Sequence, residues 1–235
     1  MRLELINKRL IACAEAVRGS QTDYACDIGT DHGYLAAYLV QQGISRRVWA
    51  CDINPRPLGF AEKTIAEYGL GDSVTAVLSN GLDAFPQPPA EGSFAVICAG
   101  MGGELIADII SRSGWADKAV LILQPMTKAD VLRGWLYDNG YSITAETACE
   151  DGSFVYSVMT AVKRPPEYEC GERYLSAGFV TAETDDGRKY LAMRSARLRK
   201  AGEGMLSSSD EKKRAEGRRL TALAERLKKE SEGIL

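Results

Sequence analysis

Two carboxylates and two glycines lie close together in the segment Cys26–Tyr34, between an apolar run and an amphipathic stretch. This order predicts a strand, a glycine-rich turn and a helix, whose free N–H groups and positive dipole end favour polar ligand groups. A dinucleotide-binding turn reads G-x-G-x-x-G, whereas here the spacing is G-x-x-x-G and Asp31 replaces the middle glycine. That carboxylate would repel a pyrophosphate but not a cationic sulfonium with an amino-acid tail. The segment therefore favours S-adenosylmethionine (SAM) over NAD, the alternative being an ordinary strand-to-helix turn.

Polar residues that suit the rest of SAM occur at the ends of the predicted strands. Asp27, at the tip of the first strand, suits the methionine ammonium, directly or through water. Asp52 ends the second strand, where an acidic side chain accepts hydrogen bonds from ribose hydroxyls or caps the next helix. Asn80 follows the third strand and either binds the adenine amine or forms a turn. The predicted cofactor-binding residues are Asp27, Gly29, Asp52, Ile53, Asn80, Gly81 and Gly100.

The segment Gly100-Met101-Gly102-Gly103 follows the fourth predicted strand, where a methyl acceptor usually binds. Its glycines leave room for a large flat substrate and offer backbone N–H groups at a helix start. A tight turn is the alternative, but three glycines in four exceed what one turn needs. The motif [DNS]-P-P-[YFW], typical of enzymes that methylate amino groups of DNA bases, is absent.

Asp31 and the only histidine, His32, complete the candidate site. Methylation of a ring nitrogen of adenine uses an available lone pair and creates a positive charge, so the enzyme mainly needs alignment and a stabilising carboxylate. Asp31 is the candidate for that role and could also accept a proton from the exocyclic amine. A lone histidine is more often structural than catalytic, although this one directly follows the cofactor turn. The predicted catalytic residues are Asp31, His32 and Gly102, and the sequence shows no metal-ligand pattern.

Alternating strands and helices must position these residues. Asn54-Pro55 begins one of the helices, with Asn as N-cap and Pro in the first turn, and Pro86 falls in a surface loop. The pattern predicts a doubly wound α/β sheet of seven strands that ends in an antiparallel hairpin, the layout of a Rossmann-like class I SAM-dependent methyltransferase. The predicted elements are a helix over 3–18 that stops near Gly19, strands over 23–28, 47–52, 74–77, 94–99 and 119–123, helices over 55–68, from Glu104 and up to Asn139, and a hairpin over 141–147 and 154–162.

A break at Arg164-Pro165-Pro166 predicts two domains, residues 1–163 and 164–235. The second domain is predicted to be a coiled-coil-like αα-hairpin, with a turn at Gly202, Gly204 and 207–209 and a capping box from Ser208 to Glu211. Residues 1–163 carry a net charge of −6 and residues 164–235 a net charge of +3, so a polyanion would contact the second domain. The alternative is a solvated charged helix pair. The RNA-binding candidates are Lys8, Arg9, Arg194, Arg197 and Arg218.

Composition restricts the class of protein further. The chain has 235 residues and no apolar run of the roughly 18 residues that a membrane span needs. Its start lacks the features of a signal peptide. Its six cysteines are scattered, without a C-x-x-C pair, and most lie in apolar runs. We therefore expect a cytoplasmic protein with reduced thiols, no structural metal and no membrane partner.

Three motifs resemble the bacterial TrmK family of tRNA (adenine(22)-N1)-methyltransferases. They are Asp27–Leu35, read as DIGTDHGYL, Ala99–Gly103, read as AGMGG, and Leu123–Met126 with Trp135-Leu136-Tyr137. The resemblance implies SAM as methyl donor, methylation of N1 of adenine 22 in tRNA, and a C-terminal coiled-coil region that helps to hold tRNA. Gly33, Asn80 and Met126 depart from the family's frequent residues.

Other functions stay open from the sequence alone. A methyltransferase acting on another RNA, a small molecule or a protein fits the same fold, and so does a non-catalytic RNA-binding protein. A dehydrogenase fits worse, since the glycine spacing and the terminal hairpin both differ. We expect tRNA as partner and a monomer or weak dimer.

Overall fold

A computed structural model describes residues 6–85 and 87–234. The chain divides into two compact units. The first comprises the residues up to Ala145 together with Val158–Glu167. The second comprises Glu146–Ser157 and Tyr168–Leu235. The tip of the terminal hairpin thus groups with the C-terminal helices.

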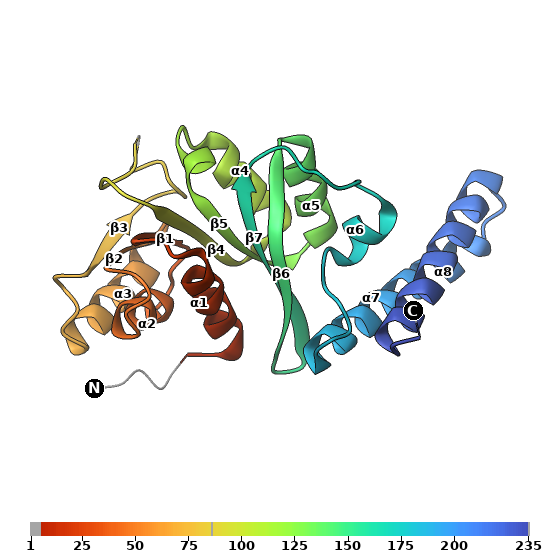
Figure 1. Ribbon diagram of the computed structural model, residues 1–235, viewed down its shortest axis with the longest axis horizontal. Helices are drawn as coiled ribbons and strands as arrows, with labels where there is room; N and C mark the ends of the chain where they lie inside the picture. The colour runs from red at the N-terminus through yellow and green to blue at the C-terminus, as the bar shows by residue number, and fades with distance from the viewer. Residues whose placement is uncertain (1–5, 86, 235) are drawn as a thin grey trace. The chain divides into compact units, whose positions relative to one another are not determined.

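One seven-stranded sheet organises the first unit (Figure 1). The strand order is β3-β2-β1-β4-β5-β7-β6; β1 pairs in parallel with β2 and β4, and β7 is antiparallel to β5. The order reverses between β1 and β4, which is where open α/β sheets bind ligands, at the carboxyl ends of the strands. The strands are β1 (Tyr24–Ile28), β2 (Arg47–Asp52), β3 (Val74–Leu78), β4 (Phe94–Gly102), β5 (Val120–Thr127), β6 (Tyr141–Asp151) and β7 (Phe154–Lys163).

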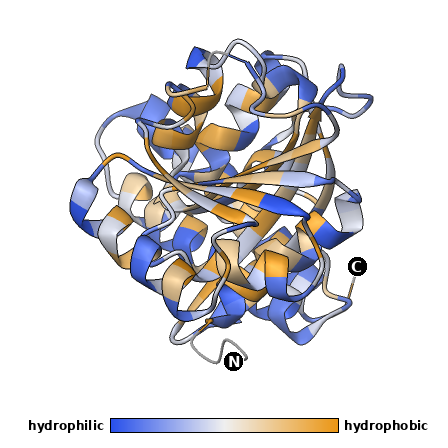
Figure 2. Ribbon diagram, turned by 90° about the vertical axis from the view of Figure 1, so that its left-hand side faces the viewer, coloured by the Kyte–Doolittle hydropathy of each residue, from blue (hydrophilic) through white to orange (hydrophobic). Residues whose placement is uncertain are grey.

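Helices cover both faces of this sheet. Helices α1 to α3 contact one another in sequence on one face, and α4 and α5 contact each other on the other. Figure 2 shows the mostly apolar strands running between helices above and below them. The predicted class I methyltransferase fold is confirmed. The helices are α1 (Lys8–Ser20), α2 (Tyr34–Gln41), α3 (Pro55–Glu67), α4 (Gly103–Arg112) and α5 (Ala129–Asp138), with a short 3-10 helix η1 (Ala116–Lys118) before β5.

Burial explains the apolar central strands. β1 and β4 lie between two helical layers, so their side chains point into the core on both faces. Cys26, Cys51 and Cys98 are fully buried there. Burial raises the pKa of the Cys26 thiol to about 12 and raises the pKa of Cys51 and Cys98 as well. These thiols therefore stay protonated and pack as small apolar groups, as the sequence predicts.

Several predicted boundaries of the first unit were wrong. The first helix begins at Lys8, because the Asn7 side chain accepts a hydrogen bond from Leu10 N at 3.0 Å, and it continues through Gly19 to Ser20. Asn54 precedes α3 as expected but makes no side-chain capping bond. The fourth strand, predicted to end at Ala99, continues through Gly100 to Gly102. Residues 3–5 of the predicted helix, and Pro86, lie outside the described residues.

The second unit is built on two long helices, α7 (Asp185–Leu206) and α8 (Glu211–Ser231), after a short unpredicted helix α6 (Glu172–Ala177). The predicted αα-hairpin is confirmed. The proposed Ser208 capping box is wrong, because Asp210 is the N-cap of α8 and accepts a hydrogen bond from Lys212 N at 2.9 Å. A small core supports the hairpin and includes Ala148 and Val155 from the tip of β6 and β7. No helix in 6–85 or 87–234 is long and apolar enough to cross a membrane.

The two long helices meet at a pair of glycines. Gly202 and Gly204 lie inside α7, not in a turn. A Cβ added at Gly202 would lie 2.8 Å from Gly217 O, and one added at Gly217 would lie 2.8 Å from Gly202 O. The backbones therefore approach as closely as glycine allows. A Cβ at Gly204 would meet no heavy atom of the described chain within 4 Å.

This difference predicts opposite effects of the same substitution. We expect Gly202→Ala to lower the unfolding free energy of the helical hairpin by about 1–3 kcal/mol, because the helices must separate. The control Gly204→Ala should raise it by up to about 1 kcal/mol, because alanine favours an exposed helix. Denaturant unfolding followed by circular dichroism measures both. Equal effects of the two substitutions would contradict the close crossing.

Candidate cofactor and acceptor site

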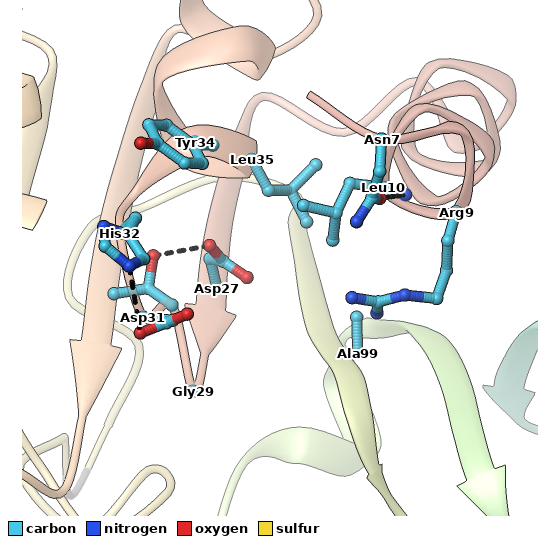
Figure 3. A pocket seen from close by; sticks show the side chains of 11 residues that line it. Asn7, Arg9, Leu10, Asp27, Gly29, Asp31, His32, Tyr34, Leu35 and Ala99 are labelled. Carbon is cyan, nitrogen blue, oxygen red and sulfur yellow. Dashed lines mark hydrogen bonds and ion pairs between the residues drawn. The ribbon is translucent and has the colours of Figure 1, made fainter. Parts of the chain in front are cut away.

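A pocket of about 270 Å³ opens at the carboxyl ends of β1 and β4 (Figure 3). Its wall combines acidic, basic, aromatic and apolar side chains from α1, β1, the β1–α2 turn, α2 and β4. It lies at the position where the strand order reverses. The lining residues are Asn7, Arg9, Leu10, Asp27, Gly29, Thr30, Asp31, His32, Tyr34, Leu35 and Ala99.

The β1–α2 turn is fixed by its backbone conformation. Gly29 has φ +71° and Asp31 has φ +52°, and the N–H groups of Gly29 and Thr30 both donate to Cys51 O. A Cβ at Gly29 would lie 2.6 Å from Met101 Cε. The left-handed dihedral angles therefore favour glycine at position 29, and any larger residue there would also displace the end of the Met101 side chain.

Asp27 supplies a buried carboxylate to this pocket. Its Oδ2 accepts a hydrogen bond from Thr30 Oγ1 at 2.6 Å. Burial raises the pKa of Asp27 to about 6, although the Thr30 hydrogen bond and the charge of Arg9 lower it. Burial makes the ionised form of this carboxylate unfavourable, because it loses solvation. A cationic ligand group beside it would stabilise the charge.

Arg9 faces Asp27 from the opposite wall. Its side chain extends from α1 toward Asp27 and Ala99 (Figure 3). Its Nη1 donates to Gln124 Oε1 at 2.7 Å. The structure thus places Arg9 in the pocket, whereas its neighbour Lys8, predicted with it to contact RNA, is exposed. The direction of the Arg9 side chain could not be predicted from the sequence, because it depends on how α1 docks on the sheet.

Asp52 organises the neighbouring strand end. Its Oδ1 accepts a hydrogen bond from Asn54 N at 2.8 Å, and its Oδ2 accepts one from Asp31 N at 3.3 Å. Two apolar side chains stand exposed beside it, Ile53 at 58% and Leu78 at 56%. Such exposure at two adjacent strand ends offers an apolar surface for a flat ring. Leu78 was not among the predicted site residues.

The remaining predicted cofactor residues lie outside the pocket wall. Asn80 is exposed, and its Oδ1 accepts a hydrogen bond from Arg112 Nη2 at 3.4 Å. Gly81 adopts φ +62° and packs against Ile109, so it is required by the turn. The wall therefore contains Asp27 and Gly29 of the predicted set, while Asp52, Ile53, Asn80, Gly81 and Gly100 lie at neighbouring strand ends.

His32 belongs to an aromatic stack at the pocket mouth. Its ring lies 5.3 Å from the Tyr34 ring and 4.8 Å from the Phe60 ring, with interplanar angles of 9° and 18°. His32 Nε2 is 3.9 Å from Asp31 Oδ1, and both side chains are partly exposed. The stack fixes the histidine ring beside the Asp31 carboxylate.

Residues Gly100–Gly102 end β4 directly after Ala99, which lines the pocket, and we name this segment the acceptor strap. Gly100 has φ +84°, and its N–H donates to Gln124 Oε1 at 3.0 Å. Gly102 is the N-cap of α4, and a Cβ there would lie 3.4 Å from Thr127 Oγ1. A flat group can approach such a strap without meeting side chains at these two positions.

The basic residues predicted in the second unit differ in their surroundings. Arg197 is exposed and Arg194 is half-buried. Arg218 Nη2 pairs with Glu211 at 2.7 Å. Among the described residues, no group of three or more His, Cys, Asp or Glu side chains is arranged to hold a metal ion.

Comparisons with known proteins point to one class of enzyme. A family profile described as a methyltransferase domain matches residues 6–159. A Bacillus subtilis (strain 168) protein named tRNA (adenine(22)-N(1))-methyltransferase is 32% identical over 177 residues, which cover 74% of this chain and 72% of the relative.

Solved structures agree with this match. Streptococcus pneumoniae Sp1610, described as a putative tRNA (m1A22) methyltransferase, superposes with a TM-score of 0.83 at 27% identity and covers 95% of this chain and 100% of its own. The complex of Sp1610 with S-adenosyl-L-methionine superposes with a TM-score of 0.80 at 26% identity and the same coverage.

The buried carboxylate predicts a conflict between stability and ligand binding. Well above pH 6 Asp27 is ionised in the folded and unfolded chain, so the folded chain bears the full desolvation penalty. Below about pH 3 it is protonated in both states, and the penalty vanishes. We expect Asp27→Asn to raise the unfolding free energy by about 1–3 kcal/mol at pH 8 and to have little effect near pH 3. Urea unfolding at both pH values tests this, and a pH-independent effect would contradict it.

Proposed function

The chain belongs to the TrmK family of methyltransferases, and we propose that it methylates N1 of adenine 22 in tRNA with SAM as donor. The observation that carries this proposal is a pocket that holds a buried carboxylate opposite a guanidinium, next to a glycine strap. The choice of tRNA as substrate and of adenine 22 as the methylated base is based on the family relationship. The pocket supports a zwitterionic cofactor tail.

The residues present fit SAM part by part. Asp27 suits the ammonium of the methionine moiety, and Arg9 on the opposite wall suits its carboxylate. Asp52 lies where ribose hydroxyls would bind, while the exposed Ile53 and Leu78 suit the faces of the adenine ring. Asn80 and Gly81 follow β3 and would contact the adenine edge.

When bound, SAM supplies an electrophilic methyl group, which N1 of the acceptor adenine takes with its lone pair as the carbon–sulfur bond breaks. The positive charge passes to the adenine ring. Asp31, exposed at the pocket mouth, would stabilise that charge, and His32 would hold the neighbouring surface in place. Gly102 leaves space for the base beside Gly100.

The substrate requires an RNA-binding surface and an accessible base. An adenine inside a stacked helix is unreachable, so the base must leave its stack. We propose that residues 1–163 bind SAM and the adenine, and that residues 164–235 hold tRNA phosphates through Arg194, Arg197 and Arg218, assisted by Lys8. We further propose a cytoplasmic location and a monomer or weak dimer.

Methyl transfer from labelled SAM to an unmodified tRNA transcript tests the function. We expect 1-methyladenosine in the transcript, and loss of the label when adenine 22 is replaced by guanine. Labelling that survives this replacement would place the reaction at another nucleotide. Absence of label in every tRNA, with measurable SAM binding, would assign the enzyme another class of substrate.

Asp31→Asn isolates the role of the carboxylate charge. Asparagine tolerates the positive φ of this position, and the backbone N–H to Asp52 is retained. We expect kcat to fall by about 10- to 100-fold, while the Kd values for SAM and tRNA change by less than about threefold. The matched control is Asp72→Asn, an exposed carboxylate outside the site. Unchanged turnover in Asp31→Asn would show that this charge does not stabilise the methylated ring.

A further inference from the structure

The ladder between β4 and β5 is interrupted at the acceptor strap. Ala99 pairs with Gln124, Met101 with Pro125 and Gly102 with Thr127, with register shifts on both sides of Met101. Pro125 has no N–H to donate to the facing strand. Gly100 falls at the irregularity and has no register partner of its own. The strap therefore needs another group to fix its backbone.

The side chain of Gln124 replaces the missing ladder bonds. It is fully buried at the end of the regular part of β5. Its Oε1 accepts the Gly100 N–H at 3.0 Å, and its Nε2 donates to Pro125 O at 3.1 Å. The amide thus uses both ends to hold the two irregular strand segments at a fixed separation.

The same oxygen also holds Arg9. Arg9 Nη1 donates to Gln124 Oε1 at 2.7 Å. The guanidinium lies against the strap, since a Cβ added at Gly100 would be 3.3 Å from Arg9 Nη1. A guanidinium has five N–H donors in one plane. The hydrogen bond from Arg9 Nη1 to Gln124 therefore restrains the orientation of the guanidinium plane, and with it the direction of the remaining N–H groups.

We propose that Gln124 is a positioning residue that couples occupancy of the cofactor pocket to the conformation of the acceptor strap, through one buried oxygen shared by Arg9 and the Gly100 N–H. The naming of SAM as the pocket ligand and of the strap as the acceptor wall rests on the proposed function. A ligand anion on Arg9 restrains the guanidinium, and Gln124 transmits that restraint to Gly100. In return, an ordered strap holds Arg9 ready for the ligand.

A double-mutant cycle measures this coupling without tRNA. Calorimetry gives the Kd for SAM of the wild type, Arg9→Met, Gln124→Met and the double variant. We expect each single substitution to weaken binding by about 5- to 20-fold and the double variant to bind within about twofold of the weaker single variant. If the fold-increase in Kd of the double variant equals the product of the two single fold-increases, the coupling is overturned. Gln124→Glu retains an acceptor for both donors and should bind SAM more tightly than Gln124→Met.

Hydrogen exchange of the Gly100 amide reports the strap directly. We expect protection in the wild type that increases when SAM is added, and exchange at least about tenfold faster in Gln124→Met with no further response to SAM. The control is Leu136→Ala, which removes a fully buried side chain of α5 and lowers Tm. It should leave the Gly100 response to SAM intact. A SAM response that survives in Gln124→Met would overturn the proposal.

Turnover separates this proposal from the proposed function. In Gln124→Met we expect kcat to fall by about tenfold or more with a tRNA Kd within about twofold of wild type. A wild type that binds SAM but methylates no tRNA would refute the proposed function, and the calorimetric cycle and amide exchange would still decide the coupling. A wild type that does not bind SAM would overturn both.

Discussion

The buried carboxylate of Asp27 is the constraint on which the site depends. A charge at the end of a central strand is unfavourable in the core, so neighbouring elements must compensate it. Thr30 donates a hydrogen bond to it from the turn, and Arg9 brings an opposing charge from α1. The helix before the first strand is therefore part of the pocket. The elements that lower the penalty are also those that line the ligand site.

The sequence predicted the elements of the sheet well, because burial between two helical layers demands continuous apolar runs. The bounds of β2 were predicted correctly, and those of β1 within one residue. The terminal hairpin followed from two adjacent strand patterns without room for a helix. Local capping was less predictable, since Asp210 and Ser208 compete for the start of α8 within three residues.

Only those parts of the candidate site whose residues are close together in the sequence could be predicted. Asp27 lies near the end of β1, and Gly29 and Asp31 lie in the turn that follows, so their proximity follows from spacing. Gln124 and Arg9 meet across 115 positions in the chain, and their contact depends on the docking of α1 and the interruption at Pro125. Neither the docking of α1 nor the interruption at Pro125 produces a periodic pattern in the sequence. An isolated Gln-Pro pair at the end of an apolar strand is the feature of the sequence that marks the interruption.

The buried cysteines beneath the site have a consequence for how this protein responds to its chemical surroundings. Thiols whose pKa burial raises react slowly with oxidants and alkylating agents, because the thiolate is the reactive form. Cys26, Cys51 and Cys98 lie on three adjacent strands, so they become reactive together only when the sheet itself opens. Cys170 is the partly exposed thiol of the described chain. The number of modified thiols therefore reports whether the sheet has unfolded.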